Sequence, residues 1–299
     1  MYKIYNYNIY MSENEQLLNN IKYDDVLDML GLTLLIYDYG KKIDYVKGDT
    51  LENFVLRMNT EKNDISEFKQ SVITSLASNV SDGQIKDFIS DPDTDLQVGI
   101  TMSKEKKRIS IIFRGSESSY DWYYDLKFLK KCINKEKNIY VHRGFYKQLT
   151  VNDNHERLIN SVKNILLDYP DYSIYVCGHS LGGALSTLFG YLLSQEVTQE
   201  VTVVSFASPR VGNHGWKQSF IETKNLTHYR ISNCNDIVTA FPSVLYYHVG
   251  DNIRLERKKK PSIFFNYSYS WWDYSMFKCY SPGDHSCSEY YKHLINYKW

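Results

Sequence analysis

Residues 172–189 constrain the fold more than any other part of the chain. Residues 172–176 are β-branched and aromatic, and residues 184–189 have the composition of a helix. Between them, Gly178 and Gly182 flank Ser180 in the pattern G-x-S-x-G. A serine held on a strained strand-to-helix turn leaves no room for a Cβ two residues away on either side. The pattern therefore predicts an elbow that lifts the serine hydroxyl to the start of a helix, where backbone N–H groups face an oxyanion.

Composition excludes several classes of protein. The 299 residues carry 35 basic and 35 acidic side chains, so no net charge draws the chain to nucleic acid. We find no run of eighteen apolar residues, which argues against a transmembrane helix. The first residues lack an apolar signal segment and the five cysteines have no metal-ligand spacing, so we expect an intracellular, cytoplasmic protein with reduced thiols.

Hydrophobic periodicity predicts an α/β fold with a mostly parallel central sheet and helices on both faces. We expect one domain over residues 1–299, in which residues 1–90 form a helical lead-in. The predicted helices cover residues 15–39, 64–80, 144–168 and 286–297, and the predicted strands cover residues 96–102, 108–113, 172–176, 201–206, 226–232 and 244–249.

A nucleophilic serine needs a base and a group that orients the base, and in hydrolases of this architecture the order is Ser, acid, His. The acidic residues after the serine are Glu196, Glu200, Glu222, Asp236, Asp251, Glu256, Asp273 and Asp284. Asp236 is best placed, because it lies in a polar turn just after a predicted strand. A plain turn aspartate is the alternative interpretation.

His285 is the favoured base, because it lies in a loop just before the last predicted helix and can reach a serine at the sheet edge. The competing histidines are fixed by predicted helices or strands, and they are His214, His228, His248 and His293. For the oxyanion we expect two N–H donors, Leu181 next to the serine and Ser116 after the strand that ends at residue 113.

Several motifs in one order resemble the class 3 lipases, a family with the α/β-hydrolase fold that includes the fungal triacylglycerol lipases. The resemblance covers roughly residues 90–297, and its motifs are residues 113–116 with 121–122, 141–145, 178–183, 207–213, 235–238 and 247–250. It implies that Ser180, Asp236 and His285 form a catalytic triad, with Ser116 and Leu181 as the oxyanion hole. It also implies hydrolysis of acylglycerol esters through an acyl-enzyme, without a metal or organic cofactor.

Other functions remain open at this stage. The same chemistry fits a phospholipase or galactolipase, and a lipase scaffold can also serve as a non-catalytic interaction module. A peptidase or thioesterase shares the triad but has no specific feature in its favour.

An amphipathic segment follows Ser116. Its apolar side chains recur at helical spacing. In the lipases that the chain resembles, a short helix at this place is a lid that opens at a lipid interface, whereas a surface helix packed on the core would show the same pattern. The candidate lid residues are Trp122, Tyr123, Leu126 and Leu129. We expect a lipid ester as substrate and transient contact with a lipid interface, with no nucleic-acid partner.

Overall fold

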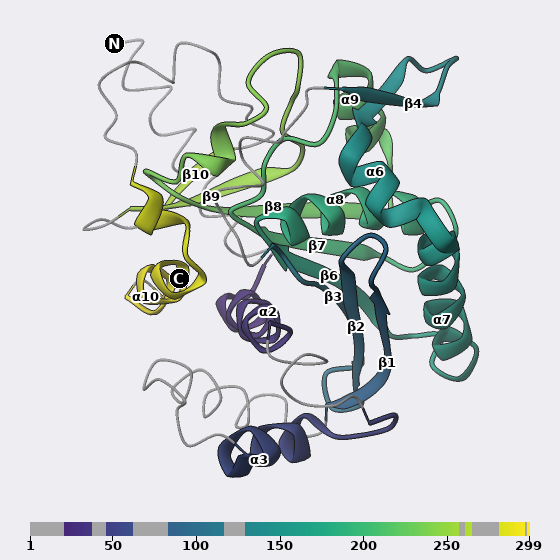
Figure 1. Ribbon diagram of the computed structural model, residues 1–299, viewed down its shortest axis with the longest axis vertical. Helices are drawn as coiled ribbons and strands as arrows, with labels where there is room; N and C mark the ends of the chain where they lie inside the picture. Colours follow the sequence, from purple (N-terminus) through teal and green to yellow (C-terminus); the bar gives the residue numbers. More distant parts are fainter. Residues whose placement is uncertain are drawn as a thin grey trace, which may run out of the picture.

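An eight-stranded sheet forms the centre of the protein (Figure 1). The computed structural model describes residues 21–37, 46–61, 83–116, 129–256, 261–264, 281–296 and 298–299. In sheet order the strands are β1 (Gln84–Asp91), β2 (Leu96–Ser103), β3 (Arg108–Phe113), β6 (Ser173–His179), β7 (Val201–Phe206), β8 (Leu226–Asn233), β9 (Asp251–Leu255) and β10 (Ser262–Phe264). A separate two-stranded ribbon joins β4 (Lys130–Asn134) to β5 (Ile139–His142).

The five strands from β3 to β9 run parallel, and the strands at both edges are antiparallel. Parallel strands need cover on both faces, which explains why β3 and most of β6 and β7 are buried. The predicted fold class, a mostly parallel sheet covered by helices, is confirmed.

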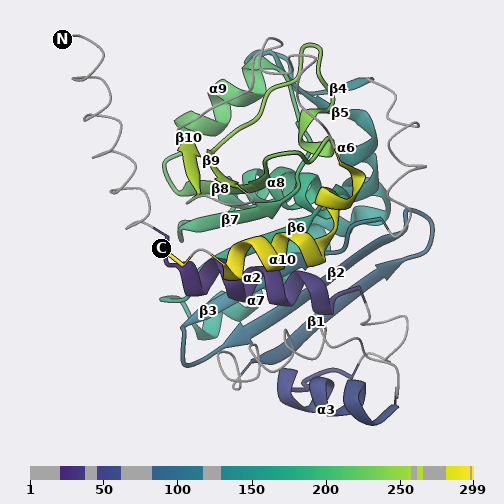
Figure 2. The ribbon, with the colours of Figure 1, turned by 90° about the vertical axis from the view of Figure 1, so that its left-hand side faces the viewer.

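Helices cover the two faces of the sheet unequally. The face that carries Ile112 and Cys177 packs against α2 (Tyr23–Leu35), α3 (Leu51–Glu61) and α10 (Cys287–Ile295). The opposite face packs against α6 (Arg143–Thr150), α7 (Asn154–Asp168), α8 (Leu181–Ser194) and α9 (His214–Glu222). Figure 2 shows α2 and α10 side by side across the first face. Among the described helices, we find none that combines the length and apolar character needed to cross a bilayer.

Three sequence expectations are wrong in detail. The helix predicted over 144–168 is broken into α6 and α7, because Asn152 and Asp153 have positive φ and the amide of Asn152 donates to Asp91 at 3.1 Å. The strand predicted over 244–249 is an irregular loop in which Tyr247 forms one isolated bridge to Gly212. Within the lead-in predicted to be helical, residues 84–90 belong to strand β1 and pair with β2.

Helix α2 is tied to the sheet by a buried ionic cluster. Arg108 is 2% exposed and donates to Asp25 at 2.9 Å and to Asp28 at 3.0 Å. Lys106 also donates to the carboxylate of Asp28, which is 1% exposed. The guanidinium of Arg108 lies 5.3 Å from the ring centre of Tyr175 on β6. Because Arg108 and Asp28 are buried, the loss of either residue would leave a buried charge with fewer partners.

We expect Asp28→Ala to lower the free energy of unfolding by about 3 kcal/mol, because it leaves Arg108 and Lys106 without a shared carboxylate. The matched control is Lys107→Ala, because Lys107 and Asp171 form an exposed pair at 2.7 Å. Urea unfolding would measure both variants, and the control should stay close to the wild type. Equal shifts in the two midpoints would contradict a structural role for the buried cluster.

Burial lowers the pKa of His179, His228 and His248 well below the ordinary 6.5. The cation of Arg230 lowers the pKa of His228 and His248 further. The unfolded chain therefore binds protons below about pH 6.5 that the folded chain does not bind. We expect the free energy of unfolding to fall as the pH drops below that value, by up to about 1.4 kcal/mol per pH unit for each histidine.

Urea unfolding at a series of pH values would measure this fall, with His228→Gln as the comparison, because glutamine does not titrate. The slope should be smaller in the variant than in the wild type. An unchanged unfolding midpoint between about pH 7.5 and about pH 5 would rule out buried neutral histidines.

Candidate active site

Ser180 lies at the sharp turn between the end of β6 and the start of α8. Its backbone has φ 58° and ψ −121°, a conformation that is strained for any residue with a Cβ. A Cβ at Gly178 would overlap the carbonyl group of Gly182, and a Cβ at Gly182 would overlap the carbonyl oxygen of Phe113. The two glycines therefore let α8 approach the strand ends closely, and the backbone strain of the turn lies at Ser180.

The three residues predicted as a triad are joined by hydrogen bonds in the structure. Nε2 of His285 lies 2.9 Å from Oγ of Ser180, and Nδ1 lies 3.0 Å from both carboxylate oxygens of Asp236. A carboxylate accepts from an N–H, so Nδ1 carries the proton and Nε2 accepts from the serine hydroxyl. The residues are 4%, 5% and 2% exposed in the order Ser180, His285, Asp236. This arrangement can move a proton from the hydroxyl to the imidazole.

Asp236 receives further donors that the sequence did not predict. The backbone N–H of Val238 donates to one carboxylate oxygen at 2.9 Å, and the hydroxyl of Tyr290 donates to the other at 2.7 Å. The same hydroxyl accepts from the backbone N–H of Asn233 at 3.0 Å. Tyr290 is wholly buried, so its hydroxyl bridges the end of β8 and the acid in a place without bulk water.

The segment that carries His285 is bonded to the segment that carries Asp236. His285 ends a single 3-10 turn, η4 (Pro282–His285), and the side chain of Ser286 caps α10 directly after it. The amide of Asn233 donates to the carbonyl of Asp284 at 2.8 Å. The N–H of Ser281 donates to the carbonyl of Asn235 at 3.2 Å. These bonds fix the distance between the acid and the base.

A second histidine, His179, forms a hydrogen bond to the backbone of His285. Nε2 of His179 donates to the carbonyl oxygen of His285 at 2.7 Å, and the hydroxyl of Tyr37 lies 3.3 Å from Nδ1 of His179. Burial and the neighbouring His285 hold the pKa of His179 well below its usual range, so its ring stays neutral. Its position inside the elbow, next to Ser180, is the sequence signal that could have identified it.

The two predicted oxyanion donors lie on either side of the elbow. Leu181 is the first residue of α8, where backbone N–H groups have no acceptor within the helix. Ser116 follows β3 and is partly buried. A Cβ at Gly115 would overlap the carbonyl oxygen of His179, so the segment before Ser116 lies directly against the elbow.

Three of the four competing histidines have hydrogen-bond partners outside the triad. His228 lies 2.8 Å from Oγ of Ser205, His248 lies 2.7 Å from the carbonyl of Thr239, and His293 lies 2.9 Å from the amide oxygen of Asn233. His293 is buried in α10, and His214 is the first residue of α9.

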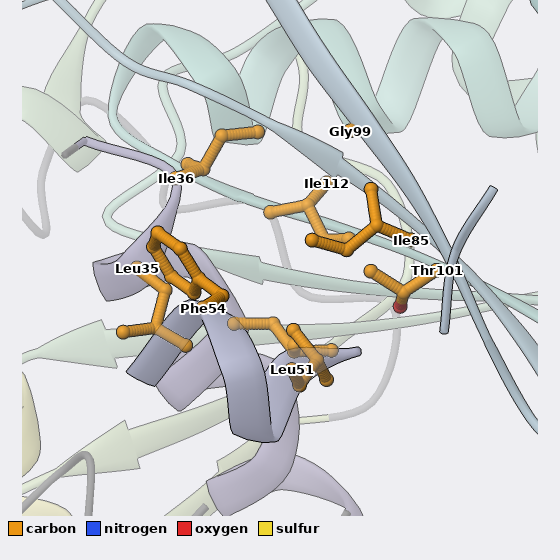
Figure 3. A pocket seen from close by; sticks show the side chains of 9 residues that line it. Leu35, Ile36, Leu51, Phe54, Ile85, Gly99, Thr101 and Ile112 are labelled. Atoms are coloured by element: carbon orange, nitrogen blue, oxygen red, sulfur yellow. The ribbon is translucent and has the colours of Figure 1, made fainter. Parts of the chain in front are cut away.

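An apolar pocket lies on the α2 face of the sheet, away from these residues. Figure 3 shows Leu35, Leu51 and Phe54 on the helices facing side chains on the strands. The strand residues that line it are Ile85, Gly99, Thr101 and Ile112. None of the triad residues lines this pocket. Within the described ranges, no group of three or more His, Cys, Asp and Glu side chains is arranged to hold a metal ion.

The candidate lid falls largely outside the described residues. Trp122, Tyr123 and Leu126 lie there, as does the helix predicted over 64–80. Leu129 is described, and the residue is 51% exposed.

Comparisons of sequence identify the relatives of the chain. Residues 110–246 match the family described as Lipase (class 3). Phospholipase A1-IIgamma of Arabidopsis thaliana is 28% identical over 182 residues, which cover 52% of this chain and 43% of that protein. The lipase of Rhizomucor miehei is 29% identical over 163 residues, which cover 52% of this chain and 44% of that protein. The match thus spans less than half the length of these curated relatives.

Comparisons of structure agree with the sequence. The Rhizomucor miehei lipase in its propeptide complex has a TM-score of 0.67 at 22% identity, over 87% of this chain and 78% of that chain. The lipase of Rhizopus microsporus var. chinensis has a TM-score of 0.63 at 25% identity, over 80% of this chain and 88% of that chain. The resemblance to the class 3 lipases that the motifs predicted is thereby confirmed, and the fold that carries it is the α/β-hydrolase fold.

Proposed function

We propose that this chain is a serine esterase that hydrolyses carboxylic esters of lipids through Ser180, His285 and Asp236. The observation that carries the proposal is the continuous series of hydrogen bonds from the Ser180 hydroxyl through His285 to the buried carboxylate of Asp236. Its place at a strand-to-helix elbow supports the same conclusion, because there the hydroxyl lies next to helix N–H groups.

The first half of the reaction acylates the serine. Nε2 of His285 takes the hydroxyl proton while Oγ of Ser180 bonds to the ester carbonyl carbon. Asp236 stabilises the imidazolium that forms and holds Nδ1 protonated. The backbone N–H groups of Ser116 and Leu181 donate to the tetrahedral oxyanion. The imidazolium then gives its proton to the leaving alkoxide, so the alcohol departs neutral.

The second half of the reaction releases the acid. A water molecule gives a proton to Nε2 of His285, and its oxygen bonds to the acyl carbon. Collapse of the second oxyanion breaks the bond to Oγ, and Ser180 regains its proton from the imidazolium. These residues complete the hydrolysis of an ester by proton transfer and covalent catalysis.

The names of the relatives support a lipid ester as the substrate class. They include phospholipases A1 and a lipase, so a triacylglycerol and a phospholipid are both consistent with the family. We place acylglycerol esters first, with a phospholipid or galactolipid as the alternative within the same chemistry.

Replacement of the nucleophile is the direct test. We expect Ser180→Ala to lower kcat by very roughly a millionfold, because triad residues act as a unit. Hydrolysis of p-nitrophenyl esters from butyrate to palmitate would measure the loss and also the acyl-chain preference. Ser186→Ala is the matched control, because Ser186 is a buried serine of the same helix that bonds to the carbonyl of Gly183. A Ser180→Ala variant with most of the wild-type activity would overturn the assignment.

A fluorophosphonate probe separates an enzyme from a non-catalytic module. If the probe labels the wild type but not Ser180→Ala, Ser180 is an activated nucleophile, even where the natural substrate has not been tested. A folded protein that is neither labelled nor active on any ester would favour the interaction module.

Tyr290 is a positioning residue for Asp236 in this mechanism. We expect Tyr290→Phe to lower kcat by roughly ten- to a hundredfold with a smaller change in KM, since hydrogen bonds to charged groups contribute about 1.5–3 kcal/mol. The variant removes a donor from the acid and leaves the N–H of Asn233 without this acceptor.

The control is Tyr191→Phe, which removes another buried tyrosine hydroxyl, one that bonds to Ser219 at 2.8 Å far from the triad. Steady-state kinetics and thermal unfolding of both variants would be compared. If both lose stability but neither loses kcat, Tyr290 has a structural role alone.

A further inference from the structure

Two neighbouring apolar side chains project into solvent from the loop that follows Asp236. Val244 is 63% exposed and Leu245 is 65% exposed, and we call this pair the apolar tip. Leu129 lies close to it, because the hydroxyl of Tyr246 donates to the carbonyl of Leu129 at 3.3 Å. Leu129 is itself 51% exposed. Exposed apolar side chains that lie together are a candidate surface for contact with another apolar phase.

The backbone holds the apolar tip in place at an energetic cost. Leu245 has φ 58°, a left-handed conformation that is rare for a bulky side chain. The loop that carries it is fixed from inside, because Arg210 donates to the carbonyls of Ala240 and Pro242 and His248 bonds to the carbonyl of Thr239. This strained backbone holds the leucine side chain in water, so it adds no packing to the hydrophobic core. Backbone strain without a gain in packing indicates a functional role for the residue.

Positive charge lies beside the tip. Lys130 on β4 places its ammonium 4.8 Å from the ring centre of Tyr246, the residue that follows the tip. The backbone N–H of Arg143 donates to the carbonyl of Leu129 at 2.8 Å. Residues 129–150 carry six basic side chains and one acidic side chain, a net charge of +5: Lys130, Lys131, Lys135, Lys137, Arg143 and Lys147 against Glu136. The loop over residues 237–250 contains no acidic residue.

We propose that the apolar tip, Leu129 and the basic side chains of residues 129–147 form a docking surface for an anionic lipid bilayer. Leucine and valine side chains would enter the acyl boundary while lysine and arginine side chains meet phosphate headgroups. The whole protein has no net charge, so attraction to an anionic surface requires a local concentration of basic residues such as this one. The inference rests on the proposed function, because the bilayer would bring acyl esters to Ser180. The loop that carries the apolar tip is linked to the triad, since the N–H of Val238 in this loop donates to the carboxylate of Asp236.

Vesicle co-sedimentation of the full chain as Ser180→Ala tests the proposal without hydrolysis. We expect binding to vesicles of phosphatidylcholine mixed with phosphatidylglycerol, weakened by salt, and much weaker binding to phosphatidylcholine alone. In this background Leu245→Ser should weaken binding by about tenfold, because a leucine no longer leaves water. Lys131→Gln and Arg143→Gln should each weaken it by about fivefold, because each removes one cation near the surface.

The controls lie at the opposite end of the sheet. Leu167→Ser removes a leucine that is 81% exposed at the end of α7, and Lys104→Gln removes a cation in the turn between β2 and β3. Neither should change vesicle binding, and thermal unfolding would establish that all variants fold. No binding to anionic vesicles, equal binding to both vesicle types, or equal loss in the control variants would each overturn the proposal. Since binding is measured without Ser180, an inactive wild type would count against the proposed function and leave this result standing.

Discussion

The close approach of α8 to the carboxyl ends of β3 and β6 is the contact on which the candidate site depends. Gly178 and Gly182 permit it, because a Cβ at either position would overlap a backbone carbonyl group. The chain between them must reverse within a few residues, which forces the positive φ of Ser180. Such strain costs on the order of 1–3 kcal/mol. Burial of 13 of the 14 residues of α8 between the sheet and the neighbouring helices offsets that cost. The strained conformation of Ser180 is thus stabilised by the packing of the helix that follows it.

The acid and the base are held by bonds between their own loops. Asp236 and His285 come from segments 49 residues apart, yet Asn233 and Asn235 bond directly to the turn that carries His285. A buried carboxylate is costly unless donors surround it, and here His285, Val238 and Tyr290 supply them. The donors that stabilise the charge therefore also orient the imidazole toward Ser180. Fixed geometry of this kind lowers the entropy cost of reaching the transition state.

The sequence predicted what local sterics and chain order dictate. Ser180 was identifiable because only glycine fits at the two flanking positions, and Asp236 and His285 because the order of triad residues and the resemblance to a family both select them. Tyr290 was not identifiable, since an aromatic residue on an amphipathic helix has the pattern of an ordinary core residue. The break at Asn152 depends on an acceptor on β1, Asp91, which is distant in sequence. Residues 244–249 have the composition of a strand, but they form an irregular loop in which His248 bonds back to the carbonyl of Thr239. Periodicity does not reveal such a contact.

The loop over residues 237–250 links the acid to the surface. Arg210 is buried with its guanidinium donating to the neutral carbonyls of Ala240 and Pro242. Burial lowers the pKa of His248, and the cations of Arg230 and Arg210 lower it further, so His248 stays neutral. A neutral ring can donate from Nε2 to the carbonyl of Thr239 without bringing a second buried cation beside Arg210. The hydroxyl of Thr239 donates in turn to the carbonyl of Asp236 at 2.9 Å. These buried contacts tie the loop on both sides of Leu245 to the segment that carries Asp236, so the proposed docking surface keeps a fixed position relative to that carboxylate.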